Sequence, residues 1–167
     1  MSWSTALNAV STLAVVSGVW FAIVEMRRFR HQRVHDSAVQ LVTAFQTSDF
    51  QEAIHIVVML PEGLSKPEIV ARLGPDARFV HLFLTRLEGI GMLVGRREIA
   101  IDHVADLISG PVVIGWRKLC RYVEDERAET GSVVWLEWVQ WLAERIEEQQ
   151  TEKPKQPAYL QHRDWKP

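Results

Sequence analysis

The chain has 167 residues, a formal net charge of −2 and one cysteine, Cys120. This length suffices for one hydrophobic core beside a terminal anchor, and a single cysteine excludes an intrachain disulfide. Residues up to His35 carry four arginines and one glutamate, whereas the rest of the chain carries fifteen basic and twenty acidic side chains. The acidic part argues against a nucleic-acid partner, because neutralising phosphates requires a basic face.

The first predicted element is a membrane anchor, residues 1–26. Residues 3–24 contain no charged side chain and would form a helix of ~33 Å, enough to cross a hydrocarbon core of ~30 Å. Four arginines follow at once: Arg27, Arg28, Arg30 and Arg33. By the positive-inside rule they predict a single pass through the inner membrane, with the N-terminus outside and the C-terminal domain in the cytoplasm. We expect this collar, residues 27–35, to contact the anionic leaflet.

Small residues recur at every fourth position of the anchor, at Ala14, Gly18 and Ala22. This spacing lets two membrane helices approach closely. We therefore predict self-association, or a contact with another membrane protein, through this face.

Helical periodicity continues through residues 36–151, which predicts an all-α fold: the membrane helix runs on into a small cytoplasmic helical bundle. Ser48 or Asp49 is expected to cap the first helix of the bundle, and Ser65 with Glu68 has the spacing of a capping box. Apolar residues then cover a broad arc between residues 76 and 94, as expected of a central helix packed on two neighbours.

Three more helices are predicted. Asp102 is expected to cap a short helix, and Ser109-Gly110-Pro111 a second one that ends near Gly131. Ser132 is the predicted cap of the last helix, whose apolar stripe begins at Trp135 and includes Trp138. We expect residues 152–167, which are rich in proline, to form a flexible tail.

Several short motifs follow one another along the chain: the anchor, Arg-Arg-Phe-Arg at 27–30, Arg-Leu-Glu-Gly-Ile-Gly-Met-Leu-Val at 86–94, Ile-Asp-x-Val at 101–104, Ile-x-Trp at 114–116 after a Gly-Pro pair, and Arg127. In this order they resemble the uncharacterised bacterial family called domain of unknown function 4760. The resemblance extends to about Glu148. It implies a membrane-anchored helical domain and supplies no reaction, substrate or site.

Arg127 falls on the apolar face of its predicted helix, so its guanidinium is directed toward the core and needs a partner. Glu88, at the edge of the central helix's arc, is the best candidate. We interpret the two as a structural ion pair; the alternative is a ligand site, to which His81, two turns before Glu88, could contribute. By contrast, the cluster Arg117, Lys118 and Arg121 is interpreted as a solvated helix flank.

No motif indicates a cofactor, metal or catalytic site. Glu52 and His55 have the Glu-x-x-His spacing of di-iron bundles, but those need two copies of the motif and two further glutamates. Gly89 and Gly91 lie inside a helical stripe and form no phosphate loop. Trp141, with Val134 and Arg145, gives an apolar strip that could meet a partner protein or the membrane surface, or pack in the core or a crevice.

Three functions remain open. The favoured one is a membrane-tethered, non-enzymatic interaction or accessory domain. The second is a membrane-bound small-molecule sensor or enzyme that uses Glu88 and Arg127, which would have to converge on a concave site. The third is an oligomeric pore lined by Asn8 and Ser11.

Overall fold

The computed structural model describes residues 17–22, 24–26, 45–152 and 156–166. The chain divides into two compact units, Met1–Gln40 and Leu41–Pro167. In the first unit, residues 17–22 and 24–26 are helical, and Gly18 and Ala22 are exposed there. Ala14, Asn8, Ser11 and the four collar arginines lie outside the described residues. Among the residues that are described, no helix combines the length and apolar character needed to cross a membrane.

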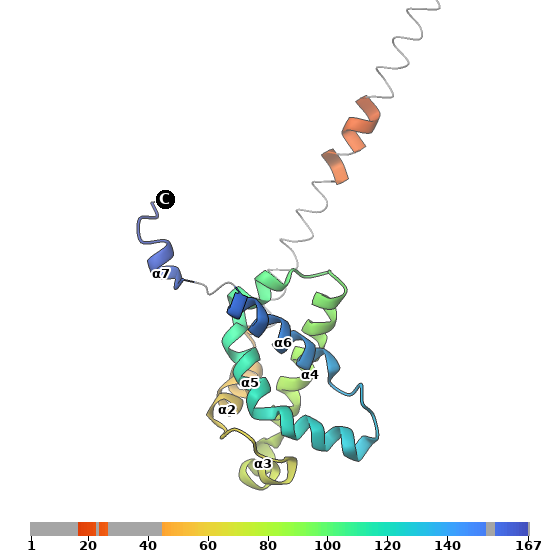
Figure 1. The fold of residues 1–167 in the computed structure, drawn as a ribbon, viewed down its shortest axis with the longest axis vertical. Coiled ribbons are helices and arrows are strands. Elements are labelled where there is room, and N and C mark those ends of the chain that lie inside the picture. The colour runs from red at the N-terminus through yellow and green to blue at the C-terminus, as the bar shows by residue number, and fades with distance from the viewer. Residues whose placement is uncertain (1–16, 23, 27–44, 153–155, 167) are drawn as a thin grey trace, which may run out of the picture. The chain divides into compact units, whose positions relative to one another are not determined.

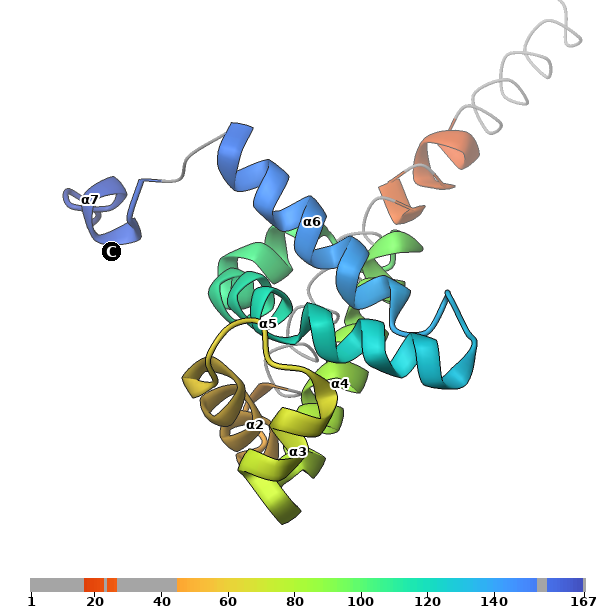
Figure 2. The same cartoon turned by 60° about the horizontal axis from the view of Figure 1, so that its bottom comes forward.

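Every element described in the second unit is a helix, which confirms the all-α prediction (Figure 1). The elements are α2 (Ser48–Met59), α3 (Lys66–Leu73), the 3-10 helix η1 (Gly74–Ala77), α4 (Arg78–Gly95), α5 (Ile101–Thr130), α6 (Glu137–Glu152) and α7 (Ala158–Gln161). Helix α4 packs against α2 and α6, and α6 also packs along α5 (Figure 2).

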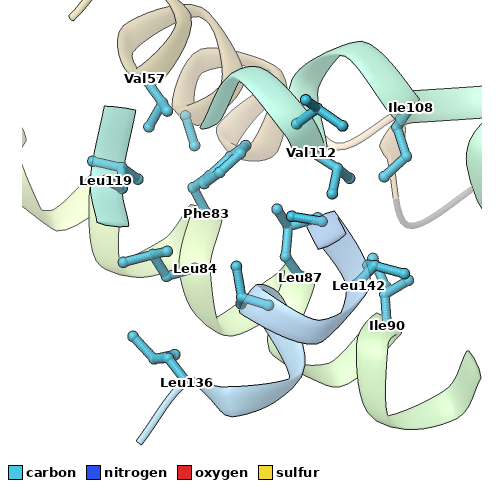
Figure 3. Packing of buried hydrophobic residues seen from close by; sticks show 14 of the residues in the cluster. Val57, Phe83, Leu84, Leu87, Ile90, Ile108, Val112, Leu119, Leu136 and Leu142 are labelled. Atoms are coloured by element: carbon cyan, nitrogen blue, oxygen red, sulfur yellow. The ribbon is translucent and has the colours of Figure 1, made fainter. Parts of the chain in front are cut away.

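The predicted central helix is confirmed as α4, whose apolar arc is buried between α2 and α6. Phe83 and Leu87 of this arc are surrounded by side chains from α2, α5 and α6 (Figure 3). The largest fully buried side chains are Phe50, Phe83, Ile69, Leu84, Leu87, Leu119, Leu142 and Ile146. Because these come from every α-helix from α2 to α6, those helices share one core.

The start of α3 has the predicted capping box. The backbone N–H of Ser65 donates to the Glu68 carboxylate at 2.8 Å, and the Ser65 hydroxyl donates to the same oxygen at 2.5 Å. Asp125 of α5 adds a long-range cap, because its carboxylate accepts the N–H of Lys66 at 2.7 Å. Neither Ser48 nor Asp49 caps α2, since the helix already includes both and Thr47 precedes it.

The two helices expected on either side of Ser109 are joined in α5, with a kink at Ile108 (φ −143°, ψ 22°). Pro111 explains the kink, because proline has no N–H to donate and its ring clashes with the carbonyl four residues earlier. Asp102 does not cap this helix, which begins at Ile101 after Ala100. The helix ends as predicted, at Gly131 in the left-handed conformation (φ 67°).

Helix α6 begins four residues later than the sequence predicts, at Glu137 instead of directly after Ser132. Residues 132–136 form turns between α5 and α6, and Leu136 has a positive φ of 57° while its side chain is buried. Ser132 therefore does not start the helix. The burial of Leu136 instead fixes the position at which α6 begins. We call residues 132–136 the α5–α6 loop.

Candidate functional site

Arg127 holds the α5–α6 loop from the last turn of α5. Its Nε donates to the carbonyl oxygen of Trp135 at 2.8 Å, one terminal nitrogen donates to Gln140 Oε1 at 2.9 Å, and the other donates to the carbonyl oxygen of Leu136 at 3.4 Å. A planar guanidinium can serve three acceptors at once, which a lysine ammonium does less well. The side chain therefore connects the loop to the first turn of α6.

Glu88 holds the same region from α4. Its Oε2 accepts the backbone N–H of Val139 at 2.9 Å, in the first turn of α6. Such a carboxylate satisfies a helix N-terminus and interacts favourably with the helix dipole. Partial burial raises the pKa of the Glu88 carboxyl above its ordinary value, while the backbone N–H groups of Val139 and Trp138 act in the opposite direction.

The ion pair predicted between Glu88 and Arg127 is not formed in the described part of the chain, where the ion pairs involve other residues. The two charges instead share a target, the loop and the first turn of α6, which they bind from α4 and from α5. The structure does not add His81 to this arrangement. Its side chain is exposed, and its carbonyl oxygen accepts the Thr85 hydroxyl at 2.8 Å.

The loop that Arg127 and Glu88 fix presents three consecutive apolar side chains to solvent. Val133 is 83% exposed, Val134 58% and Trp135 38%. Leu136, directly after them, is only 5% exposed and holds the unfavourable left-handed conformation. A backbone held in such a conformation persists only where its surroundings fix it, as the Arg127 hydrogen bond does at the Leu136 carbonyl.

The predicted apolar strip is divided by the structure. Trp141 is half-buried and meets Trp138 edge to face, with ring centroids 5.7 Å apart. Trp138 in turn packs on α4, so the two tryptophans belong to a helix contact. Arg145 pairs with Glu148 at 2.5 Å. Only Val134 remains in the exposed patch, and Trp135, which the sequence placed in the core stripe, joins it there.

Two glycines of α4 allow the close approach of Trp138. A methyl group on Gly91 would lie 2.8 Å from the carbonyl carbon of Trp138 and closer still to its oxygen; one on Gly95 would collide with the indole ring. A methyl group on Gly89 would meet nothing within 4 Å. The motif at 86–94 therefore contains Glu88, which caps α6, and Gly91, on which the backbone of α6 packs. This role was not predicted from the sequence, although Gly91 and Gly95 have the same spacing of small residues, one at every fourth position, as the anchor.

A second set of basic residues, interpreted from the sequence as a solvated flank, closes the loop between α2 and α3. Lys118 Nζ donates to the carbonyl oxygen of Val58 at 2.7 Å and also to that of Leu60, at the end of α2. Arg121 donates to the carbonyl oxygen of Gly63 at 3.2 Å. Arg117 and Arg121 both have exposed side chains, as the predicted flank requires, whereas Lys118 is partly buried.

Glu52 and His55 both have exposed side chains on α2. Within the described residues, no three histidine, cysteine, aspartate or glutamate side chains gather as they would around a metal ion.

No protein-family model matches the chain, and no curated protein or solved structure gives a match. The resemblance to domain of unknown function 4760 therefore stays a prediction.

Proposed function

We propose that the protein is a membrane-tethered, non-enzymatic interaction domain that binds a protein partner through the α5–α6 loop. The observation that carries the proposal is the exposure of Val133, Val134 and Trp135 on a backbone fixed by Arg127. Consecutive exposed apolar residues are unfavourable on a soluble surface unless a partner covers them. A loop fixed in advance loses little conformational entropy on binding.

Charge favours a partner other than a second copy. Residues 36–152 carry eleven basic and nineteen acidic side chains, so two such domains repel each other. Glu137, at the edge of the α5–α6 loop, is exposed. We infer that the partner's docking site is an apolar recess bordered by basic residues, because complementary charge suppresses wrong partners.

The tether in this proposal is the predicted span of residues 3–24. Its described residues support it: Val19, Trp20 and Phe21 are each more than half exposed on a helical segment. Apolar side chains grouped on an exposed helix favour an apolar environment, and the arginines after them favour the inner membrane with the domain in the cytoplasm. Small residues at Gly18 and Ala22 leave room for a second membrane helix, so self-association or a membrane-protein partner belongs to the same proposal.

The enzyme or sensor alternative is less well supported. It requires Glu88 and Arg127 to be available to a ligand, and both side chains are occupied by backbone groups of α6 and the α5–α6 loop. A ligand at this position would have to break those hydrogen bonds. Their arrangement supports a structural role, which in turn supports the interaction domain.

Site-specific photocrosslinking of the full chain in cells tests the docking surface. A photoreactive amino acid at Val133 should give a discrete crosslinked product with a different chain, and Trp135→Ala should remove it. The same group at Glu147, exposed on α6, is the matched control and should give none. Equal products at both positions, or none at Val133, would refute docking through the loop. A product of twice the chain's mass would identify a second copy as the occupant and overturn the charge argument.

A further inference from the structure

We call residues 153–167, after α6, the C-terminal tail. Its described residues, 156–166, have local structure but no buried side chain. Helix α7 covers only Ala158–Gln161, and a turn follows in which the N–H of Trp165 donates to the carbonyl oxygen of His162 at 3.0 Å. All residues described in the tail are exposed. Tyr159 is 76% exposed and Trp165 70%.

Helical turns of this kind are not stable alone in water. An isolated helix needs about 12 to 15 residues before its hydrogen bonds offset the cost of nucleation. Helix α7 has four residues and buries none of them. The turns and the exposed Tyr159, Leu160 and Trp165 together indicate a segment that is completed by an external surface.

The charge of the tail indicates which kind of surface it binds. The tail carries Lys153, Lys155, Arg163 and Lys166 against Asp164, whereas residues 36–152 have an excess of eight acidic side chains. That acidic domain would attract the tail, yet the tail's aromatic side chains stay exposed. The apolar residues are therefore not buried on the domain to which they are attached.

We propose that the C-terminal tail is a lipid-binding segment, with Tyr159, Leu160 and Trp165 in the headgroup region of an anionic bilayer and Arg163 and Lys166 on its phosphates. Tyrosine and tryptophan prefer this interface because each has an apolar body and a polar group. Basic residues add the attraction to anionic lipid on which interfacial segments rely. The acidic domain itself is repelled by that surface, so the tail gives it a lipid contact of its own.

A fluorescent probe on the tail tests the proposal with the full chain. Cys120→Ser removes the native thiol, and Gln161→Cys places an environment-sensitive fluorophore beside Leu160. The control places the same probe at Glu147→Cys on α6, whose side chain is exposed. Both proteins are assembled in nanodiscs of phosphatidylcholine, or of equal parts phosphatidylcholine and phosphatidylglycerol, each with and without brominated lipid.

We expect brominated lipid to quench the probe at residue 161 only in the phosphatidylglycerol discs, and to leave the probe at residue 147 unquenched in both. One basic residue near an anionic surface strengthens binding about fivefold, so Arg163→Ala with Lys166→Ala should weaken the tail's binding about 25-fold. Leu160→Ala with Trp165→Ala should abolish the quenching.

Three results would overturn the proposal. Quenching that does not depend on phosphatidylglycerol would show that the tail does not need anionic lipid. No quenching in either disc would show that the tail does not bind lipid. A probe that is shielded without lipid quenching, in proportion to protein concentration, would place the tail on a second copy. Val133→Asp, which changes the α5–α6 loop and not the tail, should leave the quenching at residue 161 unchanged, so the two proposals can fail separately. If residues 3–24 fail to span the membrane, the same probe can be read after anionic vesicles are added to the protein.

Discussion

The carboxylate of Glu88 accepts the backbone N–H of Val139 at 2.9 Å, so a side chain of α4 closes the first turn of α6. Arg127 of α5 binds the carbonyl groups that directly precede that turn. One side chain thus satisfies donors at the start of α6 and the other satisfies acceptors in the loop before it. The position of the exposed loop depends on both.

Removal of the Arg127 side chain should loosen the α5–α6 loop. Arg127→Ala leaves two backbone carbonyls and Gln140 without their donor, and hydrogen bonds to a charged group contribute about 1.5 to 3 kcal/mol. We expect the free energy of unfolding to fall by about 2 to 3 kcal/mol, measured by urea denaturation. Amide hydrogen exchange of residues 132–139 should quicken more than that of α2. Arg127→Lys should be intermediate, since an ammonium cannot reach all three acceptors. Uniform exchange across all helices would contradict a local role.

The Glu88 carboxyl should make stability depend on pH in a direction opposite to that of a salt-bridged acid. Its folded pKa is raised by burial, whereas an unfolded glutamate titrates near ~4.3. The contribution of the Glu88 carboxyl to the free energy of unfolding is then complete below its unfolded pKa, and it is lost as pH rises through its folded pKa. Glu88→Gln keeps an oxygen for the Val139 N–H and cannot titrate.

We therefore expect Glu88→Gln to gain stability relative to the unmodified chain as the pH rises from 4 to 7. Glu88→Ala should lose about 1 kcal/mol, because the N–H of Val139 is left unsatisfied. Denaturation curves of the three proteins over this range give the comparison. The opposite result, in which the unmodified chain becomes more stable relative to Glu88→Gln as pH rises, would contradict this prediction. It would show that the dipole of α6 outweighs burial and that the folded pKa of Glu88 is lowered.

The elements that the sequence predicted correctly are those determined by nearby residues. The arc of α4 follows from its own periodicity, the box between Ser65 and Glu68 spans three residues, and the end of α5 follows from Gly131. In each case the residues that decide the structure lie within about one helical turn of it. The local sequence is therefore sufficient to predict these elements.

The partners of Glu88 and Arg127 could not be predicted in the same way. Periodicity showed which face of its helix each charge occupies, and burial required a polar partner. It did not show that the start of α6 lies between α4 and α5, because that depends on Leu136 and Trp138 packing far along the chain. With the backbone of α6 as an available partner, a direct ion pair was unnecessary.

Lys118 and Arg117 are neighbours with different expected effects. Lys118 donates to two carbonyl groups at the end of α2, whereas the Arg117 side chain is exposed. Lys118→Ala should lower the free energy of unfolding by about 1 to 2 kcal/mol. Arg117→Ala should change it by less than about 0.5 kcal/mol. Thermal denaturation of both variants makes the comparison, and equal effects would show that Lys118 is no more than the solvated charge predicted from the sequence.

The predicted topology can be tested with a reporter fused to the C-terminus. A fluorescent protein that matures only in the cytoplasm should be active there, because the arginines follow the span. Replacing Arg27, Arg28, Arg30 and Arg33 with glutamine should reduce the active fraction. A reporter exposed to the periplasm in the unmodified chain would refute the placement, and a fully soluble fusion would refute the anchor.

The three glycines of α4 give the sharpest test of the contact between α4 and α6. Gly91→Ala would place a methyl group against the backbone of Trp138, which cannot move without displacing α6. Overpacking of this kind costs about 1 to 3 kcal/mol, and here we expect the upper end. Gly95→Ala should cost less, because it meets the indole ring, and a side chain can rotate away. Gly89→Ala meets no atom within 4 Å and should stabilise α4 by up to about 1 kcal/mol, since alanine favours helix over glycine. Urea denaturation of the three variants should give this order. A stabilising Gly91→Ala would show that α6 does not pack on α4 at this position, and the Glu88 cap on Val139 would then fail with it.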